Sequence, residues 1–406
     1  MKKCFIFLFS IISLLLNAKT QLKPGTYRGI LILNEIEGIE LPFNFDVLKL
    51  KKGYSLVIKN AQERITIDQL KHKGDSLFFK MPVFDTEFKC QITGDTISGV
   101  WINNYRKEKN KIKFKAYPSN QRFLFAQTSG NTQFEGRWET TFSPNMNDSS
   151  KAIGLFKHIE NTNYIEGTFL TETGDYRFLE GMTINQQMYL SCFDGSHAFL
   201  FIATLNDKKL TGKFYSGAHW QTNWEASENK NFSLRNANEI TFLKDQSKPI
   251  DFSFKDLNGK MVSLSDLQFK NRVVLLQVMG SWCPNCMDES AYLSELYKKY
   301  KSNGLEIIAL AFEKTTDFKT AQQQVKRLKN RFGIEYNMLI TQLSGKEKAS
   351  ETLSALNKIS AFPTLLFLNR SHQVVRIHTG FNGPATGTLF NDFKQETEQI
   401  INELIR

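Results

Sequence analysis

The chain has 406 residues, of which 41% are hydrophobic, so it has room for two or three hydrophobic cores. Its formal net charge is +11, but the basic residues are scattered along the chain. The densest basic cluster runs from Arg106 to Lys115 and alternates with Ile112 and Phe114, which is typical of a solvated strand face. We therefore expect no nucleic-acid partner, while the charge leaves open a surface role at anionic membranes or at an acidic partner.

Residues 1–18 have the pattern of a signal peptide. Lys2 and Lys3 precede an apolar stretch from Phe5 to Leu16, and the small residue Ala18 follows at a plausible cleavage point. The apolar stretch is too short to span a membrane comfortably, so an N-terminal membrane anchor is the weaker alternative. We expect a chain exported to the periplasm or beyond, with membrane association left open.

Residues 19–243 predict an all-β region. Short runs of alternating apolar and polar residues, such as 43–47 and 88–92, are separated by turns such as Lys52-Gly53. We expect this region to bind a partner of the protein. A ligand-binding β-protein, with the rest of the chain as a regulator, is an alternative.

An internal repeat divides this β-rich region. Several segments recur at nearly constant spacing: Gly25-Thr26-Tyr27 as Gly136-Arg137-Trp138, Leu77-Phe78-Phe79 as Met188-Tyr189-Leu190, Phe88 as Phe199, and Ile97 to Trp101 as Leu210 to Phe214. We expect two similar antiparallel meanders, residues 19–120 and 121–245. They would form two small barrels or one long curved sheet.

The β-rich region offers little catalytic chemistry. Ser191, Asp194 and His197 lie close together, but contiguous residues on a turn predict a hairpin loop in preference to a catalytic triad. Cys90 and Cys192 each lie alone in a strand-like run, which favours buried, inert thiols, and a bridge between them stays open. Four tryptophans are expected to pack in the core in preference to lining a ligand cavity: Trp101, Trp138, Trp220 and Trp224.

The chemistry is concentrated after the apolar run Val273 to Val278, which predicts a buried strand of a parallel type. Trp282-Cys283-Pro284-Asn285-Cys286 follows, and then apolar residues at three- and four-residue steps predict an amphipathic helix. The N–H groups and dipole at the start of a helix favour a thiolate there. The spacing of three brings both thiols to one face, so we expect Cys283, usually the more exposed, to attack a disulfide and Cys286 to resolve the mixed disulfide.

This region, residues 246–406, resembles the thioredoxin superfamily, specifically the TlpA/ResA-type periplasmic thiol–disulfide oxidoreductases. The resemblance rests on strand, WCxxC including Trp282, helix, and the later Ala361-Phe362-Pro363-Thr364 before an apolar strand. It implies that Pro363 is cis and lies beside the redox cysteines, and that Glu289 is the acidic residue typical of these reductases. The chain departs from thioredoxin at Gln277, where thioredoxin has an acid, and it lacks the proline that often kinks the helix, near Ala291.

The resemblance implies an α/β thioredoxin-like fold with a central sheet flanked by helices, so the whole chain is expected to be multidomain. The remaining elements are a hairpin over Phe252–Leu264, strands at Leu305–Phe312, Tyr336–Ile340, Leu365–Leu368 and Val374–His378, and helices at Asp317–Phe332, Lys346–Asn357 and Leu389–Ile405. Residues 317–357 form an insertion typical of this group.

We expect neither a metal nor a cofactor other than the redox-active disulfide Cys283–Cys286. A zinc site would need further ligands at short spacing, and the six histidines form no close pair at helical spacing. In an exported chain a CxxC pair is more often redox chemistry than a metal site.

The sequence thus predicts an exported thiol–disulfide oxidoreductase that reduces protein disulfides, with a membrane thiol donor as a further partner. A thiol peroxidase of the peroxiredoxin type is the alternative enzyme, but it needs Thr or Ser three residues before the reactive cysteine, where this chain has Gly280. The natural substrate, the direction of the reaction, the redox potential and the oligomeric state are left open.

Overall fold

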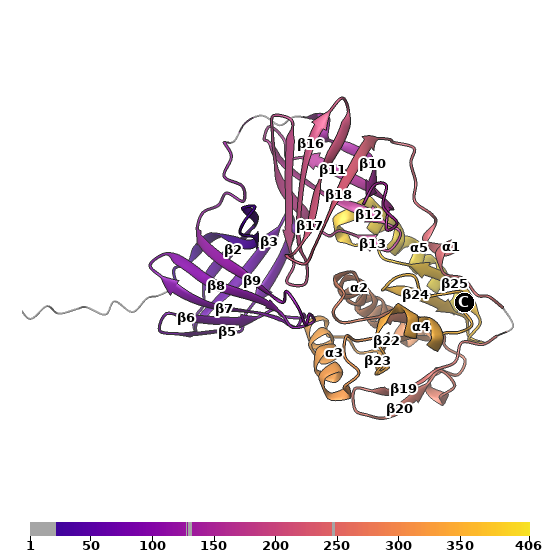
Figure 1. The fold of residues 1–406 in the computed structure, drawn as a ribbon. Coiled ribbons are helices and arrows are strands. Elements are labelled where there is room, and N and C mark those ends of the chain that lie inside the picture. Colours follow the sequence, from indigo (N-terminus) through magenta and orange to yellow (C-terminus); the bar gives the residue numbers. More distant parts are fainter. Residues whose placement is uncertain (1–21, 127, 129–131, 246–247) are drawn as a thin grey trace, which may run out of the picture.

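The computed structural model describes residues 22–126, 128, 132–245 and 248–406, and the expected signal peptide lies outside these residues. Figure 1 shows a β-rich part, coloured indigo to pink, beside a mixed part, coloured orange to yellow. The strands form three sheets of nine, nine and seven strands in the described chain. No described helix is both long enough and apolar enough to cross a membrane.

The first sheet is an antiparallel meander in the order β4-β3-β2-β1-β9-β8-β7-β6-β5. In β7, Phe88, Cys90 and Ile92 are buried and alternate with exposed polar residues, the period-two pattern of a half-buried strand. β1 pairs with β2 and also with β9, which brings the two ends of the meander together. The strands are β1 (Gly25–Asn34), β2 (Ile39–Lys49), β3 (Tyr54–Asn60), β4 (Glu63–Ile67), β5 (Leu70–Lys73), β6 (Ser76–Lys80), β7 (Thr86–Thr93), β8 (Thr96–Asn103) and β9 (Lys111–Pro118).

The second sheet closes into a barrel. Its order is β11-β10-β18-β17-β16-β15-β14-β12-β13, and a further pairing of β11 with β12 completes the ring. Aromatic rings fill the interior, with Phe201 and Phe214 stacked at 4.2 Å between ring centroids. The elements are the 3-10 turn Thr132–Phe134, β10 (Gly136–Phe142), β11 (Ser150–His158), β12 (Tyr164–Thr171), β13 (Gly174–Asp175), β14 (Leu179–Ile184), β15 (Gln187–Phe193), β16 (Ala198–Asn206), β17 (Lys209–Ser216) and β18 (Trp220–Glu228).

The third sheet has the order β20-β19-β23-β22-β21-β24-β25. All seven residues of β21 are buried, and β21 pairs parallel with β22 and antiparallel with β24. The short helix α1 (Ala237–Ile240) precedes this part. The other elements are β19 (Ser253–Asp256), β20 (Met261–Ser263), β21 (Val273–Met279), α2 (Pro284–Tyr300), β22 (Leu305–Ala311), α3 (Phe318–Phe332), β23 (Asn337–Ile340), α4 (Gly345–Thr352), β24 (Thr364–Leu368), β25 (Val374–Thr379) and α5 (Thr388–Ile405), with 3-10 turns at Leu267–Phe269, Lys301–Asn303 and Pro384–Thr386.

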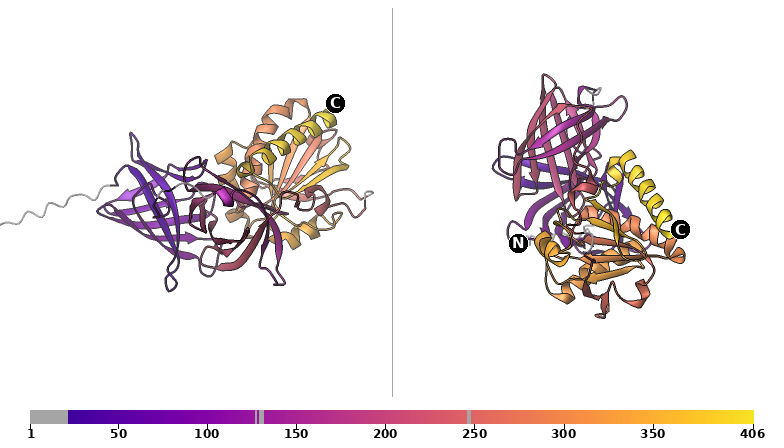
Figure 2. Two further views of the ribbon diagram at one scale, coloured as in Figure 1. Left: turned by 90° about the horizontal axis from the view of Figure 1, so that it is seen from above. Right: turned by 90° about the vertical axis from the view of Figure 1, so that its right-hand side faces the viewer.

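The helices contact the third sheet at defined strands. α2 contacts β22 and α3, and α5 contacts β21. Figure 2 shows α5, in yellow, running along the outside of this part toward the C-terminus. These contacts hold the start of α2 at the end of β21, which is where the sequence places its two redox cysteines.

One predicted helix is too long. The sequence favours a helix over Lys346–Asn357, whereas α4 ends at Thr352. The following residues instead contact the chain that enters this part, since Lys244 N–H donates to the Ala355 carbonyl and Asn357 N–H to the Phe242 carbonyl. Tertiary hydrogen bonds thus replace the last helical turn.

The hydrophobic residues of the described chain form two clusters. One fills the barrel of the second sheet. The other runs from the first sheet, across the outside of the barrel, into the third sheet, so these parts share a continuous core. Trp101, Trp138 and Trp224 are buried as expected, but Trp220 is 39% exposed because it lies at the first position of β18. The cavity inside the first sheet measures only about 10 Å³, which leaves room for no ligand larger than a water molecule.

Candidate functional site

The two redox cysteines lie where β21 gives way to α2. Cys283 is the N-cap residue of α2, and its Sγ accepts a hydrogen bond from the Cys286 N–H at 3.4 Å. The Cys283 thiol in turn donates to the Phe362 carbonyl at 3.5 Å. Both cysteines are free thiols in the structure.

The two thiols differ in exposure in the expected sense, although both are largely covered. Cys283 is 8% exposed and Cys286 is fully buried. Burial raises the pKa of Cys286 well above its usual value, and the neighbouring Cys283 raises it further. Cys286 is therefore held as a neutral thiol, which suits a residue that acts second.

The proline loop and Trp282 surround Cys283. The Phe362–Pro363 peptide bond is cis, as the sequence resemblance implies. The indole N–H of Trp282 donates to the Phe312 carbonyl at 3.0 Å, and the ring meets Phe362 edge-on at 5.8 Å between centroids. The tryptophan is thus fixed between two strand ends beside the thiols.

Glu289 lies one turn beyond Cys286 and is completely buried. Gln277, from β21, donates to its Oε2 at 2.8 Å, while its Oε1 has no hydrogen-bond partner in the described structure. Burial raises the pKa of Glu289 to about 8, so the carboxyl group is mainly protonated at neutral pH. Its charge, once formed, would oppose ionisation of Cys286.

A second buried acid, Glu313, was missed in the sequence. It follows β22, and its two carboxylate oxygens accept from the N–H and hydroxyl of Ser281 at 2.7 and 2.8 Å. Burial raises the pKa of Glu313 to about 7. The available signal was a charged residue directly after a buried strand that runs parallel to β21.

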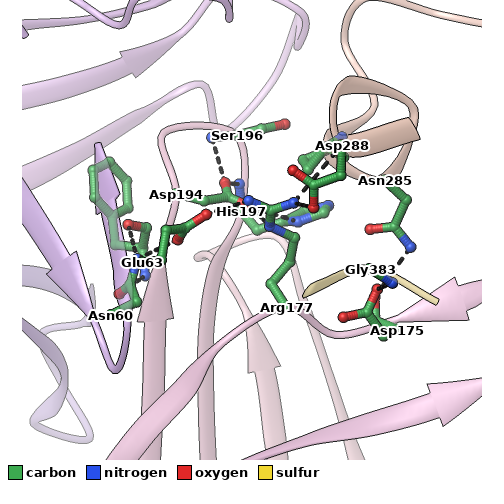
Figure 3. Close-up of polar contacts among 12 residues, drawn as sticks. Asn60, Glu63, Asp175, Arg177, Asp194, Ser196, His197, Asn285, Asp288 and Gly383 are labelled. Atoms are coloured by element: carbon green, nitrogen blue, oxygen red, sulfur yellow. Dashed lines mark hydrogen bonds and ion pairs between the residues drawn. The ribbon is translucent and has the colours of Figure 1, made fainter. Parts of the chain in front are cut away.

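Arg177, between β13 and β14, links the two β-rich sheets to α2 and is only 2% exposed. Its guanidinium makes ion pairs with Glu63 of β4, Asp194 of the β15–β16 turn and Asp288 of α2. Figure 3 shows these carboxylates converging on the arginine. Despite the arginine, burial and the neighbouring carboxylates raise the pKa of Asp288 to about 7, because one cation cannot compensate all of them.

Asn285, which lies between the two cysteines of the CxxC motif, also contacts the barrel. The Asn285 amide donates to the carbonyls of Asp175 at 3.2 Å and Phe381 at 3.4 Å. The Asp175 carboxylate accepts from the Gly383 N–H at 3.1 Å, as Figure 3 shows. The glycine- and proline-rich loop after β25 thus contacts the barrel.

The segment 191–197 forms the expected hairpin turn and no triad. The Ser191 hydroxyl donates to the Pro42 carbonyl at 2.6 Å, whereas His197 Nδ1 lies 3.1 Å from Asp194. The role of the turn is in packing, since the Ser196 hydroxyl donates to the Trp282 carbonyl at 3.2 Å. Sequence reasoning missed this contact because its partners are far apart in the chain.

The other described cysteines, Cys90 and Cys192, are buried free thiols. Burial raises the pKa of Cys90 to about 12 and that of Cys192 well above its usual value. They are not bridged in the structure. Within the described residues, no group of three or more His, Cys, Asp or Glu side chains is arranged to hold a metal ion.

A cleft of about 700 Å³ lies over Cys283. One wall comes from the loop after β8, a second from the β12–β13 hairpin and the turn before β16, and a third from the cysteine motif and the loops around α4 and Pro363. The two β-rich sheets therefore roof the redox thiol, which is why Cys283 is less exposed than the sequence suggests.

A dithiol at the first turn of a helix that leaves a buried strand, beside a cis-proline loop, defines a thioredoxin-like redox site. The model of the AhpC/TSA family matches residues 246–377. The thiol-disulfide oxidoreductase ResA of Bacillus subtilis (strain 168) is 30% identical over 138 residues, which are 34% of this chain and 69% of that protein. ResA of Halalkalibacterium halodurans is 29% identical over 131 residues, 32% of this chain and 66% of that protein.

The chain belongs, through its C-terminal part, to the thioredoxin superfamily and within it to the ResA-type thiol–disulfide oxidoreductases. It spans 64 to 66% of the length of the first curated relatives that it matches. Among solved structures, a thiol:disulfide interchange protein of Chlorobium tepidum TLS is 19% identical with a TM-score of 0.30, over 39% of this chain and 99% of that chain.

Proposed function

We propose that this protein is an exported thiol–disulfide oxidoreductase that reduces protein disulfides through Cys283 and Cys286. The observation that carries the proposal is the geometry of the cysteine pair: Cys283 caps α2 and faces the cis-proline loop, while Cys286 lies buried behind it. Membership of the ResA-type family supports the same activity.

The proposed reaction transfers two electrons. The Cys283 thiolate attacks one sulfur of the substrate disulfide, so that a Cys283–substrate bond forms and the other substrate sulfur leaves as a thiolate. Cys286 then loses its proton and attacks Cys283 Sγ, which forms the Cys283–Cys286 disulfide and releases the second substrate thiol. The protons of the two cysteines end on the two product thiols. A thiol donor, which we place at the membrane, must then reduce the protein.

Two substitutions test the roles. Cys283→Ser is expected to abolish disulfide reduction, whereas Cys286→Ser is expected to accumulate mixed disulfides through Cys283. Cys90→Ala serves as the control, since this buried thiol lies in the first sheet, and it should leave the rate unchanged. The assignment is reversed if Cys286 is the thiol that iodoacetamide alkylates in the native protein.

The two β-rich sheets are proposed to be copies of one unit, with units at residues 19–120 and 121–245 and the redox unit at 246–406. The recurring sequence segments support this, since Tyr27 and Trp138 fall in the first strand of each sheet, and Phe88 and Phe199 fall in β7 and β16. We also propose that residues 1–18 export the chain to the periplasm. Cell fractionation with and without these residues would test the localisation.

Thiol peroxidase activity is the second candidate, because the matching family model is described as AhpC/TSA. Against it, Gly280 occupies the position where such an enzyme needs a hydroxyl, and its carbonyl only accepts the Cys283 N–H at 3.1 Å. Peroxide consumption by the reduced protein at rates comparable to disulfide reduction would favour this candidate.

A further inference from the structure

The cleft over Cys283 carries more exposed positive than negative charge. Arg106 reaches it from the loop after β8, Lys314 from the segment after β22, and Lys346 from α4. The acidic side chains in its lining are Asp175 and Glu347. Asp175 is buried and already bonded to the Gly383 N–H, so it offers little charge to a ligand.

None of these cations makes an ion pair in the described part of the chain, although the neighbouring Glu313 carboxylate acts electrostatically on Lys314. The Arg106 side chain makes no ion pair or side-chain hydrogen bond with the described residues and is half-buried. Lys314 Nζ lies over the Trp282 ring at 3.8 Å from its centroid, and Lys346 Nζ donates only to the Ser360 carbonyl at 3.2 Å. A partly buried guanidinium without an anion is costly, and an anionic ligand would recover that cost.

The three cations are close to one another and to the redox thiol. Burial lowers the pKa of Lys314, and the positive charges of Arg106 and Lys346 lower it further, while Cys283 and Glu313 act in the opposite direction. An anion seated among these groups would therefore lie near the sulfur that attacks. Because Arg106 lies in the loop after β8, the first β-rich part of the chain contributes directly to the cleft.

We propose that the cleft selects disulfides carried on extended acidic peptide segments, with Arg106 as the main specificity-determining residue. The cleft volume of about 700 Å³ is that of a small-ligand pocket, so it admits a few residues of a chain and not a folded domain. Carboxylates on either side of the substrate cysteine pair with Arg106, Lys314 and Lys346 while Cys283 attacks the disulfide. This inference rests on the proposed disulfide reductase activity.

The test uses three probes of equal size. They are disulfide-linked dimers of the capped tripeptides Glu-Cys-Glu, Gln-Cys-Gln and Lys-Cys-Lys. The full-length protein without residues 1–18 is reduced beforehand, freed of reductant, and mixed with each probe in a single turnover, with the released thiol measured at 50 mM and 500 mM salt. The protein itself supplies the two electrons.

We expect the order Glu over Gln over Lys, with a rate about tenfold higher for the Glu than for the Gln probe at low salt, since each partly exposed charge pair is worth roughly a factor of two to five. High salt should reduce this ratio. Arg106→Gln should reduce the ratio to about threefold. The matched control is Lys107→Gln, which removes the same charge from the next, exposed residue outside the cleft and should keep the full ratio.

Rates for the three probes within twofold of one another would overturn the proposal. So would an equal loss of the Glu preference in Arg106→Gln and Lys107→Gln, because the effect would then be one of overall charge. Reduction of none of the probes would instead overturn the disulfide reductase activity, and this inference with it.

Discussion

Glu289 is expected to be protonated in the folded protein at neutral pH, and Glu289→Gln tests this directly. The substitution replaces a buried neutral carboxyl with an amide of nearly the same shape, in contact with Gln277. The pKa of Glu289 in the folded protein is raised from 4.5 to about 8 by burial. The folded state therefore binds a proton that the unfolded state has already lost between these two values.

The direction in which stability changes with pH follows from this raised pKa. The stability contribution of the protonated group is complete below about pH 4.5 and is lost as the pH rises toward 8. Each unit of pKa difference corresponds to about 1.4 kcal/mol, so ionisation of Glu289 would cost the fold roughly 5 kcal/mol by pH 9. We expect wild type and Glu289→Gln to be of similar stability at pH 5, with the variant more stable by a few kcal/mol at pH 9.

Urea unfolding at pH 5, 7 and 9 measures this difference. Glu295→Gln is the matched control, because Glu295 lies on the exposed face of the same helix. The Glu289 charge opposes ionisation of Cys286, which interacts with Cys283, so Glu289→Gln should lower the apparent pKa of the cysteine pair. Alkylation of Cys283 by iodoacetamide in the native protein should therefore shift to lower pH. The reasoning is refuted if wild type and Glu289→Gln show the same pH dependence of stability and an identical alkylation profile.

Arg177→Met should lower the free energy of unfolding by about 3–5 kcal/mol, because it leaves buried carboxylates without their cation. Arg235→Met, which removes an exposed ion pair, should cost much less. Equal losses in urea titrations would contradict the role of the buried network. Gly174→Ala should lower the melting temperature more than Gly259→Ala. Both glycines have positive φ, but only at Gly174 would a Cβ clash with the Asn285 amide. Equal shifts in melting temperature would mean that backbone strain alone acts. Cys192 should react with iodoacetamide only after unfolding, since burial raises the pKa of its thiol. Mass spectrometry of alkylated peptides measures this reaction. Labelling of Cys192 in the native protein would count against a closed barrel.

Local sequence patterns were sufficient to predict many of the strands and helices of the C-terminal part. The apolar run before Cys283 became β21, and the three- and four-residue spacing after Cys286 became α2. These elements depend on the periodicity of neighbouring residues, which the sequence displays directly. The cis bond before Pro363 was likewise expected from the resemblance. The sequence did not predict the end of α4, because hydrogen bonds to residues 242–244 determine where this helix ends.

The sequence by itself therefore determined the dithiol, its helix and the strands around it. Only the tertiary structure decided that Arg177 pairs with Glu63 and Asp288, and that Arg106 lines the cleft over Cys283. These partners lie more than a hundred residues apart and belong to different elements of the fold. No local period records such a pairing, since a buried charge is identified only by the groups that the completed fold places around it.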